Sequence, residues 1–298
     1  MMLDTSKNIL IVGLGLIGGS YAKALRKLGF KISAITLDRE DIDYALENGI
    51  IDFGCTEPDP KVIGRAELII FALYPHVFVE WIDKYQSYLK PGALLTDVTG
   101  VKGAIVEKIQ AMLRPDVEFI AAHPMAGREV YGVKNSDERI FHGANYIVTP
   151  TSRNTDAAVE DCLELGRLLG FSHVSVLTPE KHDEMIGFVS QLTHCIAVSL
   201  MTCYDGEKLQ DYTGDSFRDL TRIARINDDM WSELFLLNRD ALLDSMDKFL
   251  AEFMKLRASL ESGDRETMRK MMRVSTERRA LFDKKKPKRR DILYEYGF

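Results

Sequence analysis

Three glycines near the N-terminus, Gly13, Gly15 and Gly18, have the spacing of a turn that binds a dinucleotide. An apolar run over residues 9–12 precedes them and is typical of a buried strand, and a helical pattern follows over residues 20–29. In such a turn the first glycine permits the tight bend, the second lets backbone approach a pyrophosphate, and the third lets the helix pack on the strand. The helix N-terminus favours the negative charge. This strand–turn–helix context predicts a dinucleotide site.

A histidine with the chemistry of a base, His123, follows a second apolar run over residues 119–122. Sheets of alternating strands and helices bind ligands at the carboxyl ends of their strands, where this residue is expected to lie. Pro124 fixes the backbone behind it, and the ordinary pKa of a histidine, about 6.5, suits a base near neutral pH. We predict that His123 takes a hydroxyl proton as a hydride leaves. The alternative is a structural histidine bonded to a neighbouring loop.

Two further segments could bind a substrate. Gln191, His194 and Val198 share one side of an apolar helix, which indicates a cleft between domains. The alternative for His194 is a core histidine bonded to a backbone carbonyl. Arg222 lies beside Ile223 and has a guanidinium that matches the two oxygens of a carboxylate. The alternative is a surface arginine paired with an acid.

The end of the second predicted strand, at Thr36, bears on which nicotinamide cofactor binds. An acid there would accept hydrogen bonds from the ribose 2′-OH and favour NAD. Thr36 carries no charge to repel a 2′-phosphate and Arg39 could neutralise one, so NADP is slightly favoured over NAD, although Asp38 could still supply the acid. The predicted cofactor-binding residues are Gly13, Gly15, Leu16, Ile17, Gly18, Thr36, Asp38, Arg39, Leu73 and Thr99.

Alternating strands and helices must position these residues in the first half of the chain. Predicted strands cover residues 9–12, 31–36, 68–73, 94–98, 119–122 and 146–149, with helices over 20–29, 42–48, 77–89, 102–113 and 156–169. This alternation predicts an α/β fold with a Rossmann-type, doubly wound parallel sheet over residues 1–173. Helical patterns from Thr178 onward, over residues 229–260 and 264–282, predict an all-helical substrate-binding and dimerisation domain over 174–298. Helices this apolar need a partner, so we expect a homodimer.

Composition narrows the class of protein. The chain has 298 residues and a net charge of −6, which gives no indication of a nucleic-acid partner. No apolar run approaches the length of a membrane span, and the first seven residues are too short and polar for a signal peptide. The four cysteines have neither paired nor metal-type spacing, so we expect free thiols, a cytoplasmic location and no metal. The basic run at 284–290 is expected to be a solvated terminus rather than a site for an anionic partner.

Taken together, these segments resemble the prephenate and arogenate dehydrogenase family of tyrosine biosynthesis. The most specific parts are the run from His123 to Gly127, with Glu129 and Gly132, and the run from Phe217 to Ala224. The resemblance extends from about residue 8 to residue 238 and includes Met230-Trp231.

The resemblance implies oxidative decarboxylation of a cyclohexadienol such as prephenate, with hydride transfer to NAD or NADP. His123 would accept the hydroxyl proton, Arg222 would anchor a substrate carboxylate, and His194 would line the same pocket. Gln191 would also lie near the substrate, and Glu129 and Asp219 match positions where the family places acids that shape the site. The helical domain would form the homodimer.

Two departures from the family pattern bear on these expectations. Gly100 stands where members often have a serine that contacts the catalytic histidine or the substrate hydroxyl, and Thr99 or a water could substitute for it. Gln191 stands where members often have a further histidine, which leaves open whether the substrate is prephenate or arogenate. We expect no chorismate mutase segment before residue 8 and no regulatory domain after residue 282.

Two other classes remain alternatives. Hydroxyacid dehydrogenases and imine reductases have a similar plan but rely on a helix lysine or small polar residues, for which Lys181 is the nearest match. A redox-sensing protein without turnover would need no base at His123.

Overall fold

The computed structural model describes residues 4–128 and 130–282. Within them the chain forms two compact units, one ending at Ser245 and the other beginning at Met246. The division falls inside helix α11 (Arg239–Glu261). The predicted domain boundary at 173/174 therefore lies within the first unit.

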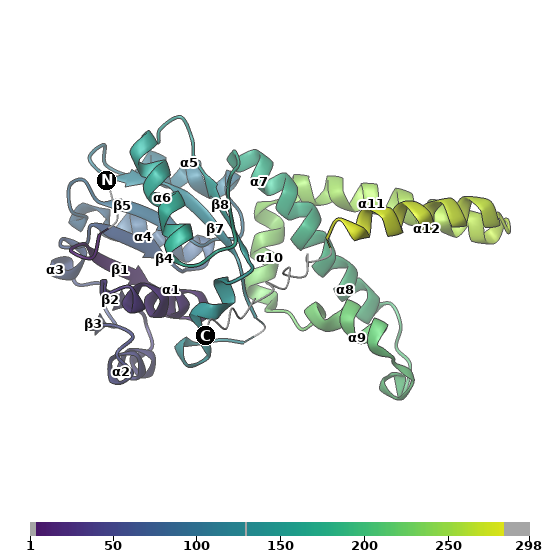
Figure 1. The fold of residues 1–298 in the computed structure, drawn as a ribbon, viewed down its shortest axis with the longest axis horizontal. Helices are drawn as coiled ribbons and strands as arrows, with labels where there is room; N and C mark the ends of the chain where they lie inside the picture. The colour runs from purple at the N-terminus through teal and green to yellow at the C-terminus, as the bar shows by residue number, and fades with distance from the viewer. Residues whose placement is uncertain (1–3, 129, 283–298) are drawn as a thin grey trace, which may run out of the picture. The chain divides into compact units, whose positions relative to one another are not determined.

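A six-stranded parallel sheet forms the centre of the first unit, with strand order β3-β2-β1-β4-β5-β6 (Figure 1). This is the order of a doubly wound dinucleotide-binding sheet, so the predicted fold class is confirmed. Its strands are β1 (Asn8–Val12), β2 (Lys31–Ile35), β3 (Phe53–Cys55), β4 (Leu68–Phe71), β5 (Leu94–Asp97) and β6 (Glu118–Phe119). Alternate residues of β1 belong to two separate apolar cores, Ile9 and Ile11 to one and Leu10 and Val12 to the other. The sheet is therefore covered on both faces.

Helices connect the strands, and several begin at residues whose side chains cap them. Asp38 accepts a hydrogen bond from the amide of Glu40, and Asp59 and Thr155 cap their own helices in the same way. Helix α1 begins earlier than the predicted start at Ser20, because it starts directly after Gly15 and includes Gly18. The helices are α1 (Leu16–Lys27), α2 (Arg39–Glu47), α3 (Pro60–Ile63), α4 (Pro75–Tyr85), α5 (Gly103–Met112) and α6 (Asp156–Leu168), with 3-10 turns at Gln86–Tyr88, Val133–Asn135 and Glu138–Phe141.

A second, three-stranded sheet was not expected from the sequence. It consists of β7 (Ala121–Met125), β8 (Asn145–Thr149) and β9 (His173–Val176), with β7 antiparallel to β8. His123 therefore lies within a strand, opposite Ile147, and not just beyond a strand's end as predicted. The apolar run at 119–122 divides between two sheets, and an apolar pattern alone does not reveal which strand it pairs with.

Helices follow from Thr178, whose hydroxyl caps the first of them, so the predicted helical character is confirmed. The predicted long helix over 229–260 is two helices that meet at Asn238, whose side-chain amide bonds to groups in the preceding helices. The elements are α7 (Pro179–Ile186), a π-helical turn (Gly187–Gln191), α8 (Leu192–Thr202), α9 (Asp215–Thr221), α10 (Asp228–Leu237) and the start of α11, with 3-10 turns at Leu209–Tyr212 and Arg222–Ala224.

The continuous helical segment Pro179–Thr202 is long and apolar enough to cross a membrane by length and composition. The sequence-based expectation that no run approaches this length was therefore wrong. Core helices of soluble proteins, which are mostly buried, pass the same test, whereas the apolar part of this segment is 28% buried in the single chain. The segment also carries the buried polar residues His182, Asp183 and Gln191.

The second unit contains the end of α11 and helix α12 (Arg265–Ala280). Gly263 turns the chain between them with a φ of +69°, and the Asp264 side chain caps α12 by accepting from the amide of Thr267. The helical pattern predicted over 264–282 is thus confirmed as α12, and the basic run at 284–290 lies outside the described residues.

Candidate functional site

The glycine turn has the geometry that a dinucleotide requires. Gly13 has a φ of +93°, and a Cβ on it would lie 2.3 Å from the carbonyl oxygen of Ala72. A Cβ on Gly18 would lie 1.9 Å from the carbonyl oxygen of Gly13, so helix and strand are in closest contact there. A Cβ on Gly15 would have no atom of the described residues within 4 Å, which leaves its backbone open to a ligand. Gly13 thus makes the tight turn and Gly18 the close packing expected of them, and the pyrophosphate contact at Gly15 stays a prediction.

The neighbours of the turn also suit an anion. Gly15 is the N-cap of α1, no side chain of the described residues caps that helix, and its first turn contains no acid. Leu16 and Ile17 form this first turn and are partly buried. The side chain of Leu73 borders the turn, because its Cδ2 lies 3.0 Å from the place that a Cβ on Gly13 would occupy.

Three residues predicted to bind the cofactor follow the carboxyl end of β2: Thr36, Asp38 and Arg39. Thr36 continues the strand with a backbone hydrogen bond to Cys55 and is partly buried. The Asp38 carboxylate is engaged 2.8 Å from the amide of Glu40, as the cap of α2. Arg39 is exposed and pairs with Asp43 on its own helix, with Nε and Oδ1 2.9 Å apart.

His123 is partly buried on β7, and its ring is held by a second histidine. Its Nδ1 lies 2.8 Å from Nε2 of His182, and Nδ1 of His182 lies 2.7 Å from Oδ1 of Asp183. His182 is completely buried. Burial lowers the pKa of His123 well below its ordinary value, and nearby His182 and Lys102 lower it further. The His123 ring is therefore neutral near pH 7 and able to accept a proton.

A buried ion pair fixes the backbone in front of His123. The Lys102 ammonium lies 2.7 Å from Oδ2 of Asp97 and donates to the carbonyl of Ala122 at 2.6 Å. The other oxygen of Asp97 accepts from the amide of Ala122 at 3.1 Å. Both backbone groups of the residue before His123 are thus fixed by charged side chains. Thr99, predicted to bind cofactor, is buried, and its hydroxyl bonds to Asp97 and lies 3.0 Å from the carbonyl of Val101.

His194 lies in the first turn of α8 and is partly buried. Its Nδ1 is 2.8 Å from the carbonyl of Ser190, and its ring stacks on Trp231 with 3.7 Å between centroids. Gln191 is buried, and both polar atoms of its side chain are hydrogen-bonded within the protein. Nε2 donates to the carbonyl of Leu234, and Oε1 accepts from Asn238.

Arg222 and Asp219 come from short elements next to α8. Arg222 begins the 3-10 turn that packs against α8, so it and His194 stand on neighbouring elements. Both Arg222 and Asp219 are exposed on the single chain. Glu129, the third residue predicted near the substrate, lies outside the described residues.

Three residues around His123 were not predicted from the sequence: Lys102, His182 and Asp183. Their positions in the sequence could have indicated them. His182 and Asp183 are polar residues near the start of a predicted helix, and Lys102 lies just after the Thr99-Gly100 segment. Spacing alone could not show that α7 and the start of α5 meet behind β7. Lys181, the alternative catalytic lysine, is exposed and pairs with Glu184 at 2.7 Å.

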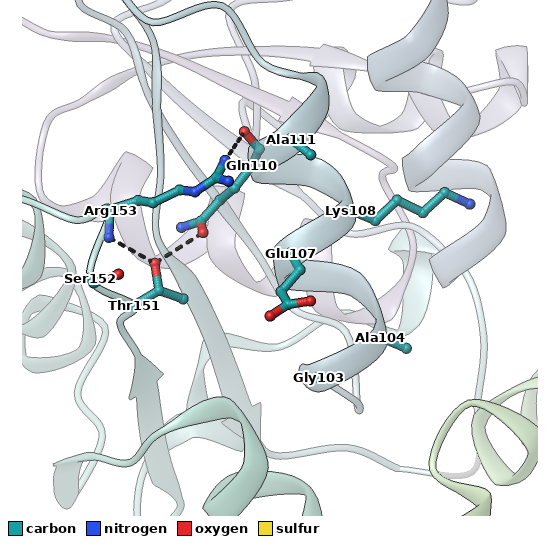
Figure 2. Close-up of a pocket in the computed structure, with 9 residues that line it drawn as sticks. All are labelled: Gly103, Ala104, Glu107, Lys108, Gln110, Ala111, Thr151, Ser152 and Arg153. Atoms are coloured by element: carbon teal, nitrogen blue, oxygen red, sulfur yellow. Dashed lines mark hydrogen bonds between the residues drawn. The ribbon is translucent and has the colours of Figure 1, made fainter.

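An open hollow lies along α5, away from the predicted residues. Figure 2 shows its lining, in which Arg153 and Thr151 bond to Gln110. Of the predicted site residues that the structure describes, none lines this hollow, so the chemistry of His123 is not located there.

Comparison with known proteins covers most of the chain. A family model described as prephenate dehydrogenase, nucleotide-binding domain, matches residues 21–175, and one described as prephenate dehydrogenase, dimerization domain, matches 178–274. A prephenate dehydrogenase of Bacillus subtilis is 34% identical over 275 residues, which cover 90% of this chain and 73% of that protein.

Two solved structures share the fold over nearly the whole chain. The prephenate dehydrogenase of A. aeolicus, in complex with hydroxyphenyl propionate and NAD+, has a TM-score of 0.86 and 29% identity, covering 95% of this chain and all of that one. The arogenate dehydrogenase of Synechocystis has a TM-score of 0.80 and 25% identity, covering 93% of this chain and all of that one.

Proposed function

The chain belongs to the prephenate dehydrogenase family of oxidoreductases, and from this premise we propose that it converts prephenate and NAD(P)+ to 4-hydroxyphenylpyruvate, carbon dioxide and NAD(P)H. The observation that carries the proposal is His123, a neutral imidazole whose Nδ1 is held by His182. Its Nε2 is the atom that would accept the ring hydroxyl proton of the substrate. Loss of that proton lets the C–O bond become a carbonyl as hydride leaves the same carbon. Decarboxylation then makes the ring aromatic, and its oxygen takes a proton back to give the phenol of the product.

The glycine turn would hold the cofactor, which supplies the hydride acceptor when it is bound. The open backbone at Gly15 and the uncapped start of α1 suit a pyrophosphate. Leu16, Ile17 and Leu73 line or border this turn, and Thr99 belongs to the buried network of Asp97 and Lys102.

A slight preference for NADP follows from the end of β2. Thr36 brings no carboxylate to the ribose, and the nearby Asp38 carboxylate is occupied as the cap of α2. The exposed Arg39, which pairs with Asp43 in the structure, would be the cation to meet a 2′-phosphate on leaving that pair. NAD becomes the better cofactor if Asp38 leaves its cap and turns to the ribose.

Arg222 would bind a substrate carboxylate through its guanidinium fork. His194 would border the same pocket from α8, with Asp219 and Glu129 shaping its charge. Gln191 would act on the substrate through its neighbours, because its amide is bonded to Leu234 and Asn238. The alternative substrate, arogenate, differs in carrying an amine where prephenate carries a keto group.

The helical part would form a homodimer, as the description of the matching family domain suggests. Large apolar side chains lie exposed on the single chain within the matched residues. They include Phe188, Val189, Met201, Leu250, Phe253 and Met254. A partner of the same kind would cover such surfaces. A cytoplasmic location is part of the same proposal.

A single set of assays tests the reaction, the identity of the substrate and the preferred cofactor together. Purified protein is mixed with prephenate or arogenate, each with NAD+ or NADP+, and formation of the reduced cofactor is followed by absorbance. We expect turnover of prephenate, with kcat/KM higher for NADP+. Turnover of arogenate alone would replace the proposed substrate, and turnover of neither would remove the proposed function.

A further inference from the structure

A carboxylate behind His123 is held by three donors. Oδ1 of Asp183 accepts from Nδ1 of His182 at 2.7 Å and from the amide of Lys102 at 2.8 Å. Its Oδ2 accepts from the amide of Gly103 at 2.7 Å, at the N-terminus of α5. An ionised carboxylate only accepts hydrogen bonds, and backbone amides only donate. The proton between Asp183 and His182 therefore belongs to Nδ1 of His182.

The position of the proton on His182 determines which atom donates the hydrogen bond between His182 and His123. Burial lowers the pKa of His182, against the raising effect of Asp183, so the ring is neutral near pH 7 and has a single N–H. That N–H is at Nδ1, which leaves Nε2 as an acceptor. Nε2 lies 2.8 Å from Nδ1 of His123, so His123 must donate this bond.

The tautomer of His123 follows from this bond. With its single proton on Nδ1, neutral His123 has an unprotonated Nε2, and no hydrogen bond reaches this atom from the residues that the structure describes. We propose that His182 and Asp183 are positioning residues that fix this tautomer and so present Nε2 as a base to the substrate hydroxyl. The inference rests on the proposed function, in which His123 is the base.

The same bonds place a negative charge where the reaction creates a positive one. When Nε2 of His123 takes the hydroxyl proton, its Nδ1 proton can move to Nε2 of His182, so that one N–H bond breaks and one forms. The cation then stands beside Asp183, which keeps its own charge throughout. Of the other charged groups packed around the rings, Lys102 disfavours the cation, and Asp97, 2.7 Å from the Lys102 ammonium, offsets that effect in part.

NMR of the resting enzyme tests the tautomer without relying on turnover. The full chain is labelled with 15N in its six histidines, and His123→Asn identifies the signals of His123. We expect a protonated Nδ1 and an unprotonated Nε2 in the wild type, and a mixture of both tautomers in His182→Leu. The matched control, His173→Leu, changes an exposed histidine on β9 and should leave the His123 signals as they are.

Two results would overturn the proposal: a proton on Nε2 of His123 in the wild type, or the wild-type pattern retained in folded His182→Leu. If His182→Leu does not fold, the wild-type spectrum still decides, and His182→Gln provides a second variant. Its amide oxygen can accept from His123 and its NH2 group can donate to Asp183, so the tautomer should be kept.

Kinetics separates positioning from a purely structural role. For His182→Leu we expect kcat to fall on the order of ten- to a hundredfold, the loss typical of residues that orient metal-binding histidines, with KM nearly unchanged. A variant that loses substrate affinity but keeps kcat would contradict the proposal. The NMR result does not depend on the substrate. Absence of prephenate turnover in the wild type would therefore refute the proposed function, while the NMR spectrum would still decide the tautomer of His123.

Discussion

His123 is surrounded by groups that make its charged form costly. Its ring lies in a buried network, with His182 at hydrogen-bond distance and the Lys102 ammonium bonded to the carbonyl of the preceding residue. Burial has the largest effect on its pKa, and these two neighbours act in the same direction. A histidine of this kind stays unprotonated at pH values where a surface histidine is half charged.

The pH dependence of kcat/KM follows from this lowered pKa. A base must be unprotonated to work, so activity is lost as the pH falls through the pKa of His123 in the free enzyme. Because this pKa lies below the ordinary 6.5, we expect kcat/KM to remain level through pH 6.5 and to decline only in more acidic buffer. Initial rates across a pH series, with stability checked at each pH, measure it. An acidic limb centred at or above 6.5 would contradict the account.

Single residues also show where sequence reasoning reached its limit. The pattern around His123 and Pro124 predicted a base, but it did not reveal His182, which is 59 residues away and meets His123 only through tertiary packing. Gly100 is a second example. A Cβ there would lie 3.5 Å from Leu234, in ordinary contact, so the family serine would fit and its absence is not imposed by space.

At the scale of elements, the strand–turn–helix at β1 and α1 was the most predictable part. Gly13 and Gly18 are required by close backbone contacts, and Gly15 is open for the proposed cofactor, so the spacing is visible in the sequence. The sheet of β7, β8 and β9 was not predictable, because its strands have the same apolar character as those of the parallel sheet. The break at Asn238 was also hidden, since it depends on bonds to Asp183 and Gln191.

Two alanine substitutions in the turn should have separable effects. Gly18→Ala places a methyl group 1.9 Å from the backbone oxygen of Gly13, so the helix must shift, at a cost of roughly 1–3 kcal/mol of stability. Gly15→Ala meets no atom of the described chain within 4 Å and should leave the melting temperature nearly unchanged, but it occupies the space that a pyrophosphate needs.

Thermal unfolding and titration with NADP+ measure these two effects. We expect Gly15→Ala to weaken cofactor binding without loss of stability, and Gly18→Ala to lose stability. A Gly15→Ala variant that binds cofactor as the wild type does would argue against a pyrophosphate at this position.

At the scale of the whole molecule, the order of a dinucleotide-binding half and a helical half was predictable from the change of pattern near residue 175. The two family matches meet close to this point, at residues 175 and 178. The two compact units divide elsewhere, at 245/246. Helices α7 and α10 belong to the first unit because Asp183 and Glu233 accept hydrogen bonds from backbone amides of the sheet half. The boundary at 173/174 therefore remains our proposal for where the dinucleotide-binding domain ends and the helical substrate-binding and dimerisation domain begins.

We propose that one imidazole in this molecule, that of His123, removes the proton that starts the oxidation. Prephenate turnover of wild type and His123→Asn at saturating cofactor measures this role, with His173→Asn as control and cofactor binding measured for each. We expect His123→Asn to bind cofactor normally and to lose turnover by roughly 10²- to 10⁴-fold, the usual contribution of a general base. Turnover by His123→Asn at the wild-type rate would contradict it.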